Sequence, residues 1–358
     1  MSVYKDSYTS SWSCKFRYTD YNGNKKQYKK TGFTTKKEAG EYESKMKKKL
    51  EGSSEESFEY VVSKYFEWCK ATSKELTVYN KDLAFKHHII PFFNDMKMSE
   101  ITKVKVREWQ LKLLSEDYKP GTVKYLNSCL SAFFSYAVEL GYYEVKPMPK
   151  AVGSTKATHI DYWTMEEFEK FMNVVDVPIY QVIFNLLYST GMRIGEMRAL
   201  TYSDFDFAKN TVSITKNVHT INGKEVITSP KTEKSNRTIT VPKEVMTMVH
   251  LFFLSNYGMK DTDTLFHVSA TGLRYAFSKF IRLSGVKKIR IHDLRHSHAS
   301  MLINMGMQIN LVSKRLGHEN IKTTLDIYTH LYESKEKELE DKLNEVFTTK
   351  NNTMLKSC

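Results

Sequence analysis

The stretch RLGHENIKTTLDIYTH, residues 315–330, combines a glycine turn with apolar residues at the three- to four-residue spacing of a helix. It places His318 directly after Gly317, and Tyr328 follows ten positions later. The simpler interpretation is two helices joined by a glycine turn, with Tyr328 packed in the core. The alternative is a nucleophile, Tyr328, accompanied by a proton-handling histidine. Choosing between them requires further reactive residues elsewhere in the chain.

Composition limits the class of protein. A chain of 358 residues is long enough for two or three domains, and its net charge of +13 predicts a polyanionic partner. No apolar run approaches the ~20 residues of a membrane span, and the N-terminus lacks an apolar signal core, so we expect a cytoplasmic protein. The cysteines match neither a disulfide framework nor a metal pair: Cys14, Cys69, Cys129 and Cys358.

The N-terminal segment, residues 1–52, is expected to be a small folded basic module. Residues 1–50 contain 13 basic and 5 acidic side chains, interleaved with aromatic residues that a disordered tail would lack. The pattern predicts two strands joined at YNGN (21–24), then a helix capped by Thr34 or Thr35, with VYKDSY (3–8) as a third strand. Because a β-ribbon fits a major groove, basic residues around the hairpin are candidates for DNA contact: Lys15, Arg17, Lys25, Lys26, Lys29 and Lys30.

Two further units follow. Residues 55–145 have apolar residues at helical spacing and predict a bundle of about four helices, one of them over residues 77–93. The proline-containing segment 146–159 predicts an interdomain linker. Residues 160–346 predict a mainly helical unit with a small antiparallel sheet between Phe205 and Val241, turning at Asn222-Gly223. Residues 347–358 are expected to be a disordered tail. The fold class is therefore multidomain and mainly α.

Arg193 is the first candidate for chemistry. The apolar segment PIYQVIFNLLYSTG (178–191) predicts a helix that ends on Gly191. Arg193 follows that glycine at the start of the next predicted helix, where a guanidinium and helix N-terminal amides together form an anion site. The alternative is a surface arginine held by Glu196, three residues later.

The segment HDLRHSHAS supplies a second candidate pair. His292 and Arg295 lie three residues apart on one face of a helix beginning near Asp293, and together they suit a phosphate. His292 and His296 also have the H-x-x-x-H spacing of a zinc-protease helix. We favour phosphate, because Asp293 replaces the catalytic glutamate and no third metal ligand stands out.

Lys231, in PKTEKSNRTI, belongs to a predicted strand-turn-strand segment and would be an ordinary solvated lysine if it stood alone. Together, however, the candidate residues resemble a known pattern, that of the tyrosine recombinase, or phage integrase, family. They have its order and approximate spacing: Arg193, then Lys231, then HDLRH, then LGH followed by Tyr328. The chain resembles this family over nearly its whole length. The resemblance implies an enzyme that breaks and rejoins DNA at specific sites, integrating and excising a mobile element without metal, cofactor or ATP.

The resemblance also implies roles for the residues. Tyr328 would form a 3′-phosphotyrosyl link, Arg193 and Arg295 would bind the non-bridging oxygens, and Lys231 would protonate the leaving 5′-oxygen. His292 would help deprotonate Tyr328 or bind the phosphate, His318 would hydrogen-bond a phosphate oxygen, and Glu196 would support the site. The sequence does not divide the proton transfers among Lys231, His292 and His318.

By the same resemblance, residues 1–52 would be an arm-type DNA-binding domain, 55–145 a core-binding domain and 160–346 the catalytic domain. A helix start in the core-binding domain gives further DNA-contact candidates, which could equally be a solvated helix end: Lys119, Thr122, Lys124 and Tyr125. The expected partners are double-stranded DNA at core and arm sites, three further copies of the chain in a homotetramer, a small excisionase and a host DNA-bending protein. The expected location is the cytoplasm of a bacterial host, on the nucleoid when bound to DNA.

Two alternatives stay open on the sequence alone. One is a DNA-binding protein of the same fold without catalysis, although no member of the reactive set is missing. The other is a zinc-dependent hydrolase built on His292 and His296. The helical pattern YESKEKELEDKLNEVF (332–347) could pack on its own domain or on a neighbouring subunit.

Overall fold

The structure is a computed structural model that describes residues 3–6, 11–19, 25–50, 56–153, 161–228, 236–333, 340 and 343–344. The chain divides into two compact units, residues 1–158 and 159–358. Within the described residues, none of the helices has the length and apolar character needed to cross a membrane.

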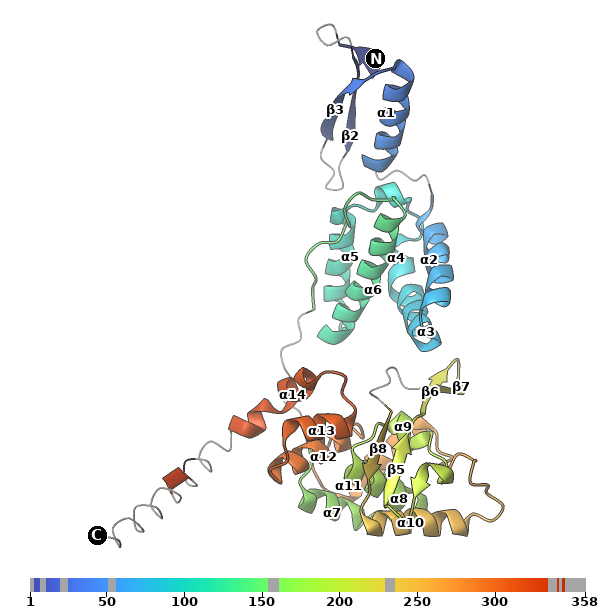
Figure 1. Cartoon of the computed structure of the whole chain (residues 1–358), viewed down its shortest axis with the longest axis vertical. Coiled ribbons are helices and arrows are strands. Elements are labelled where there is room, and N and C mark those ends of the chain that lie inside the picture. The colour runs from blue at the N-terminus through green and yellow to red at the C-terminus, as the bar shows by residue number, and fades with distance from the viewer. Residues whose placement is uncertain are drawn as a thin grey trace, which may run out of the picture. The chain divides into compact units, whose positions relative to one another are not determined.

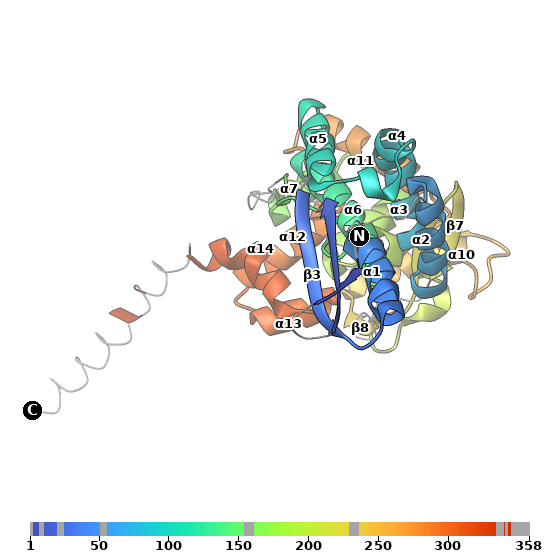
Figure 2. The ribbon, with the colours of Figure 1, turned by 90° about the horizontal axis from the view of Figure 1, so that it is seen from above.

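The N-terminal part of the first unit, here called the head, is a three-stranded antiparallel sheet with one helix. Strands β1 (Val3–Lys5), β2 (Trp12–Thr19) and β3 (Lys25–Phe33) are arranged in that order, and α1 (Lys36–Leu50) packs on one face, as Figures 1 and 2 show. The predicted third strand is confirmed, and the Thr35 hydroxyl caps α1 by accepting from the backbone N–H of Glu38. The predicted YNGN turn lies outside the described residues.

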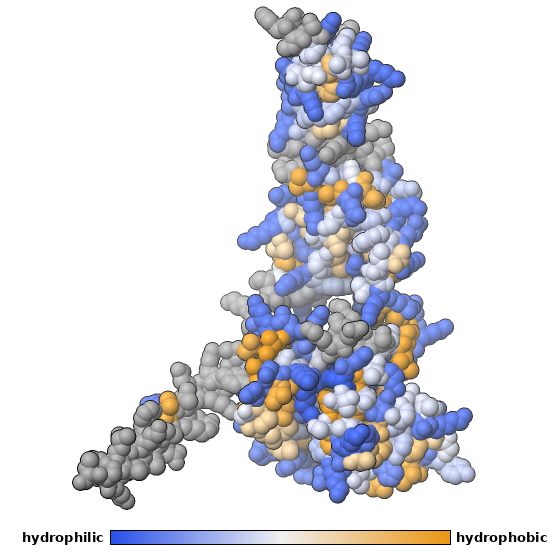
Figure 3. Space-filling view, viewed as in Figure 1, coloured by the Kyte–Doolittle hydropathy of each residue, from blue (hydrophilic) through white to orange (hydrophobic). Residues whose placement is uncertain are grey.

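The sheet divides the predicted DNA-contact residues between its two faces. Lys15 pairs with Lys29, and Arg17 pairs with Gln27, so these exposed side chains share the face away from α1. Lys26 and Lys30 alternate onto the opposite face, where Lys30 Nζ lies 3.2 Å from Tyr42 Oη on α1. Hydrophilic residues cover much of the head in Figure 3.

The rest of the first unit is a helical bundle. It contains α2 (Phe58–Thr72), α3 (Glu75–Ala84), α4 (Ile90–Phe93), α5 (Lys103–Ser115) and α6 (Pro120–Glu139) around a core rich in phenylalanine. The helix predicted over 77–93 is interrupted by a π-helical turn, Phe85–Ile89, in which the N–H of Ile90 bonds to the carbonyl of Phe85. Pro91 explains the interruption, because it has no N–H to donate to His87.

The second unit is mainly helical, with two small sheets where the sequence predicted one. Strands β4 (Phe205–Asp206), β5 (Thr211–Ile214) and β8 (Arg237–Thr240) form one sheet, whereas β6 (Asn217–Ile221) and β7 (Lys224–Thr228) form a separate hairpin. Asn222 and Gly223 both have positive φ, 51° and 76°, as a type I′ turn requires, so the predicted turn is confirmed.

The helices of the second unit are α7 (Met165–Met172), α8 (Pro178–Thr190), α9 (Ile194–Arg198), α10 (Lys243–Ser255), α11 (Ala270–Ser284), α12 (Asp293–Asn304), α13 (Ile309–Leu316) and α14 (Ile321–Glu333). The predicted helix end at Gly191, helix start at Asp293 and glycine turn at Gly317 are all confirmed. Residues 347–358 and most of the predicted helix 332–347 lie outside the described residues.

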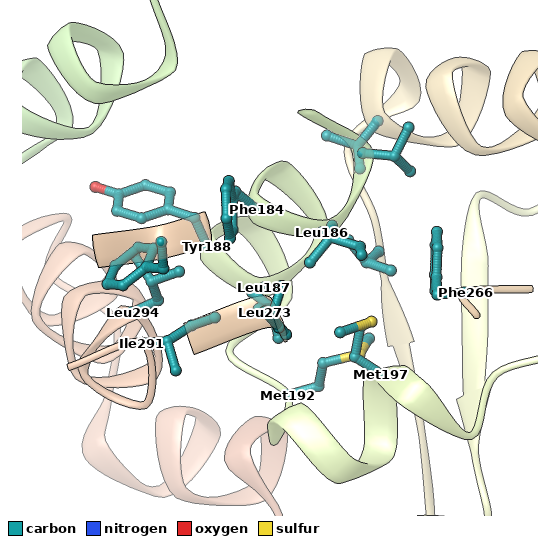
Figure 4. Close-up of a cluster of buried hydrophobic side chains, with 14 of the residues drawn as sticks. Phe184, Leu186, Leu187, Tyr188, Met192, Met197, Phe266, Leu273, Ile291 and Leu294 are labelled. Atoms are coloured by element: carbon teal, nitrogen blue, oxygen red, sulfur yellow. The ribbon is translucent and has the colours of Figure 1, made fainter. Parts of the chain in front are cut away.

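One hydrophobic core fixes the segments that carry Arg193, His292 and Arg295. Figure 4 shows Phe184 and Leu187 of α8 beside Met192, Met197, Ile291 and Leu294, all of which are buried. Met192 directly precedes Arg193 in the chain. Likewise, Ile291 directly precedes His292, and Leu294 directly precedes Arg295. The core therefore anchors the backbone on both sides of the candidate site.

Candidate active site

The candidate site is built where α8 ends. Gly191 terminates α8 in the left-handed conformation, with φ +66°. A Cβ on this residue would lie 2.6 Å from the His298 ring and 2.9 Å from the Leu316 side chain, so α12 and α13 approach the turn too closely for any side chain there. The glycine lets the end of α8 lie against the middle of α12 and the end of α13.

Arg193 lies immediately beyond this turn, at the N-cap of α9. Its Nη1 is 2.8 Å from Glu196 Oε1, and its backbone N–H donates to Glu196 Oε2. Glu196 is buried and also accepts two bonds from Arg237 on β8. Burial acts to raise the pKa of Glu196, but the two arginines outweigh it and lower that pKa to about 2. Glu196 therefore stays ionised and holds Arg193 in place.

Arg295 is the deepest cation of the site. It is only 4 % exposed, and its Nη1 donates to the carbonyl of Gly191 at 2.9 Å. Its Nη2 is buried and has no hydrogen-bond partner within the described structure. Burial, with the neighbouring Arg193 charge, lowers the pKa of Arg295 to about 9. A buried guanidinium with an unused donor is prepared to bind an anion.

The two predicted phosphate-binding histidines occupy different settings. His292 is exposed at the N-cap of α12, and partial desolvation together with Arg295 lowers its pKa. His318 follows Gly317 at the end of α13, and its Nδ1 lies 2.7 Å from Thr324 Oγ1 on α14. Desolvation, followed by the charges of Arg295 and Arg193, lowers the pKa of His318 to about 4. Both rings are therefore neutral at pH 7.

Tyr328 is buried, with 2 % of its surface exposed, and its hydroxyl meets a histidine. That histidine is His296, whose Nδ1 lies 2.6 Å from Tyr328 Oη. Burial raises the pKa of Tyr328, and the Arg295 charge opposes that effect. Desolvation and the nearby His292 lower the pKa of His296 to about 4. The pair is therefore a neutral phenol bonded to a neutral imidazole.

The structure brings most of the predicted set together. Arg193 and His318 line one surface hollow, and Arg295 interacts electrostatically with Arg193, Glu196 and Tyr328. His292 belongs to the same group, since its ring centre lies 5.6 Å from that of His296. The remaining predicted residue, Lys231, lies outside the described residues. The tentative contacts Lys119, Thr122, Lys124 and Tyr125 are all exposed in the first turns of α6 or at its N-cap.

Three residues of the site were missed or interpreted differently by the sequence reasoning. His296 was considered only as a metal ligand, yet its position four residues after His292 places it on the same helix face and so within reach of the same site. The sequence indicated no role for Arg237 or Thr324. In the structure Arg237 bonds to Glu196, and Thr324 bonds to His318, both of which were predicted site residues. Nothing in a single sequence indicates such partnerships across the fold.

The zinc alternative finds no support in the arrangement of side chains. Across the described ranges, no group of three or more His, Cys, Asp or Glu residues is placed to hold a metal ion. His296 Nδ1 is already engaged by Tyr328.

Comparison with known protein families decides between the remaining classes. Residues 162–335 match the model of the phage integrase family, residues 57–114 match the N-terminal SAM-like domain of phage integrases, and residues 2–50 match an arm DNA-binding domain. The chain belongs to the phage integrase family. It is a tyrosine-type site-specific recombinase, an enzyme that breaks and rejoins DNA by transesterification.

Similar proteins agree with this membership of the phage integrase family. The ICEBs1 integrase of Bacillus subtilis is 28% identical over 341 residues, covering 87% of this chain and 91% of that protein. A XerC-like tyrosine recombinase of Caldanaerobacter subterraneus is 26% identical and covers 70% and 73% of the two chains. Among solved structures, the Tn1549 transposon integrase in complex with a circular intermediate DNA has a TM-score of 0.67 at 18% identity, covering 78% of this chain and 99% of that one. The lambda integrase dimer bound to a core site has a TM-score of 0.59 at 15% identity, covering 76% and 95%. These two structures share the fold.

Proposed function

We propose that Tyr328 is the nucleophile of this recombinase and that Arg193, Arg295 and His318 bind the phosphate that it attacks. The observation that supports this most is the buried, unused Nη2 of Arg295 beside the buried Tyr328 hydroxyl. A donor in that position costs free energy until an anion fills it. A phosphodiester is the anion that this family of enzymes handles.

The cleavage step follows from these positions. As the Oη–P bond to Tyr328 forms, the P–O5′ bond breaks, and negative charge increases on the two non-bridging oxygens. Arg193 and Arg295 are fixed by Glu196 and by the Gly191 carbonyl, so their donors need no reorganisation when that charge develops. The neutral His318 adds a third donor. Loss of one such donor slows a reaction by on the order of 10²–10³.

Proton supply and rejoining complete the proposed cycle. Lys231, in the segment between β7 and β8, protonates the departing 5′-oxygen. His292, exposed at the start of α12, binds a phosphate oxygen. A 5′-hydroxyl from the partner DNA then attacks the 3′-phosphotyrosyl link and releases Tyr328. Because the covalent link conserves the energy of the broken bond, neither ATP nor a metal enters the scheme.

We further propose that the recombinase integrates and excises a mobile element, in keeping with the relatives named for an integrative element and a transposon. Residues 1–52 would bind arm sites, 55–145 core sites, and 160–346 would carry catalysis, joined by the linker 146–159. The chain would act as a homotetramer on paired DNA sites, aided by an excisionase and a host DNA-bending protein. It would work in the bacterial cytoplasm, on the nucleoid.

A covalent-adduct assay with an excess of EDTA tests this function. Nicked DNA carrying candidate attachment sites traps the 3′-linked species, because the short 5′ fragment diffuses away. The proposal predicts a protein–DNA adduct that survives SDS and forms equally well with and without EDTA. Cleavage that depends on metal, or that leaves no protein on the DNA, would contradict it.

A further inference from the structure

Among the histidines whose side chains the structure describes, His296 is the one that contacts the proposed attacking atom. Its Nδ1 lies 2.6 Å from Tyr328 Oη, and its ring and the Tyr328 ring are held 5.8 Å apart between centroids. We propose that His296 is a catalytic residue that accepts the phenolic proton of Tyr328 as the tyrosine attacks DNA. This inference rests on the proposed nucleophile and changes the sequence-based prediction, in which His292 would either help deprotonate Tyr328 or bind the phosphate.

The contact fixes the direction of the hydrogen bond. A phenol has one proton to donate, whereas a neutral imidazole offers one unprotonated nitrogen as an acceptor. The nitrogen is the stronger acceptor of the two heavy atoms, so Tyr328 donates and His296 Nδ1 accepts. The lone pairs of Oη are then directed away from the histidine and are free to meet a phosphorus atom.

The surroundings of His296 keep it in the accepting form. The charged or titratable groups around it are His292, Asp293, Arg295 and Arg290 from the same segment, His318 at the end of α13, and Tyr328 from α14. Partial burial, His292 and the two arginines lower the pKa of His296 and disfavour the imidazolium, whereas Asp293 favours it. His296 is therefore an unprotonated imidazole throughout the neutral range and starts each cycle ready to take a proton.

The packing of α14 against α12 explains why His296 and Tyr328 form this hydrogen bond. His296 is one turn past His292 on α12, whereas Tyr328 is on α14, and the two helices share the small core of Ala299, Ile303, Val312, Leu316 and Tyr328. Docking of α14 on this core places the phenol against His296. His292, at the N-cap of α12, is exposed, and its ring centre lies 5.6 Å from that of His296.

The proposed step balances in atoms and charge. The Oη–H bond breaks as Oη–P forms, and the proton moves to Nδ1 and leaves an imidazolium. The P–O5′ bond breaks, and O5′ takes a proton from a separate acid. In the rejoining step, O5′–P forms as the 5′-hydroxyl returns its proton to that acid, now deprotonated. The Oη–P bond breaks, and the departing phenolate of Tyr328 recovers its proton from the His296 imidazolium. Proton transfer is coupled to attack, because the phenol becomes strongly acidic only as its oxygen bonds to phosphorus.

The test compares His296→Phe and His296→Gln with the unchanged chain in single-turnover cleavage of nicked site DNA. A lost general base slows the reaction by about 10²–10⁴-fold. Without the base, attack requires a preformed phenolate, so the rate of His296→Phe should rise close to tenfold per pH unit from pH 6 to 9, more steeply than that of the unchanged chain. DNA affinity, measured separately, should change less than threefold.

Replacement of Tyr328 by 3,5-difluorotyrosine provides a rescue that a merely structural role would not produce. This phenol ionises far more readily, so it should restore most of the cleavage rate of His296→Phe. The ratio of the difluorotyrosine rate to the tyrosine rate should be much larger in His296→Phe than in the chain that keeps His296. The proposal would be overturned if His296→Phe lost the same factor in cleavage rate with tyrosine as with difluorotyrosine. It would also be overturned if His296→Phe cleaved as fast as or faster than the unchanged chain, because the hydrogen bond would then only hold Tyr328 in a resting position. If the unchanged chain forms no adduct at all, the proposed function fails rather than the role of His296.

Discussion

Arg237 and Glu196 form a two-bonded ion pair inside the second unit, with Nη2 2.8 Å from Oε2 and Nη1 3.1 Å from Oε1. Both side chains are almost completely buried, 6% and 4% exposed. Arg237 Nε also donates to the carbonyl of Arg315, two residues before Gly317. Glu196 holds Arg193, and Arg315 precedes His318, so one guanidinium links two phosphate-binding residues that are far apart in sequence.

Replacing Arg237 by methionine should therefore destabilise the second unit and slow cleavage. Removing Arg237 leaves the buried Glu196 charged, with the part-exposed Arg193 as its remaining ion-pair partner, which costs up to about 3–5 kcal/mol of the free energy of unfolding. Urea unfolding measures this loss. The control is Lys209→Met, because Lys209 pairs with Asp206 at the surface and its loss should change stability by less than about 1 kcal/mol.

A double-mutant cycle shows whether Arg237 also acts through Arg193. Arg237→Lys and Arg193→Lys should each lower the cleavage rate, and the double variant should be little slower than Arg193→Lys alone. The reason is that Glu196 lies between the two arginines. Fully additive effects would mean that Arg237 only stabilises the fold.

Thr324, which lies on α14 with Tyr328, should orient the His318 ring for phosphate binding. Its buried hydroxyl is 2.7 Å from His318 Nδ1 and fixes the orientation of that ring. Thr324→Val keeps the shape but removes a bond worth about 1 kcal/mol, so cleavage should fall roughly 3- to 10-fold. Thr324→Ser keeps the hydroxyl and should cleave within about twofold of the normal rate. Similar rates for the valine and serine variants would show that this bond has no part in catalysis.

Acid should destabilise the second unit through three partly or fully buried histidines. Desolvation is the first cause that lowers the pKa of each: to about 4 for His296 and His318, and to about 3 for His298. The unfolded chain, with pKa values near 6.5, binds more protons than the folded one below that pH. As far as these histidines are concerned, the folded state has its full free energy of unfolding above about pH 6.5 and loses it progressively as the pH falls toward 4.

Unfolding midpoints in urea between pH 4.5 and 7.5 measure this linkage. Each histidine contributes a slope of up to about 1.4 kcal/mol per pH unit. His298→Gln should reduce the slope, whereas the same change at the exposed His267 should leave it unaltered. A stability that is flat over this range would contradict the assignment.

The two faces of the head should differ in their contribution to DNA binding. Lys15 and Lys29 lie opposite each other on the exposed face, whereas Lys30 contacts Tyr42 of α1. Each lost phosphate contact reduces the slope of log K against log salt by about 0.9. Lys15→Ala and Lys29→Ala should therefore flatten the salt dependence of arm-site binding, and Lys30→Ala should not. The reverse result would place the DNA against the other face.

Much of the architecture was predictable because its signals are local. Alternation and turn residues indicated the head, helical periodicity indicated the bundle, and glycines at 191 and 317 marked two helix ends that the structure confirms. The turn of the hairpin β6–β7 was predicted, but the separation of this hairpin from the β4–β5–β8 sheet was not, because β5 pairs with the distant strand β8. The same reason hid Arg237 and His296: their function comes from residues 41 and 32 positions away. The domain boundaries and the role of Lys231 stay predictions.

The central claim is that Tyr328 becomes covalently bound to DNA, and peptide mapping of the trapped adduct tests it most directly. The chain is incubated with nicked site DNA, digested with protease and nuclease, and analysed by mass spectrometry. The account predicts a nucleotide on the peptide that contains Tyr328, and no adduct from Tyr328→Phe under conditions where that variant still binds the DNA. A nucleotide on another residue, or an undiminished adduct from Tyr328→Phe, would contradict the account.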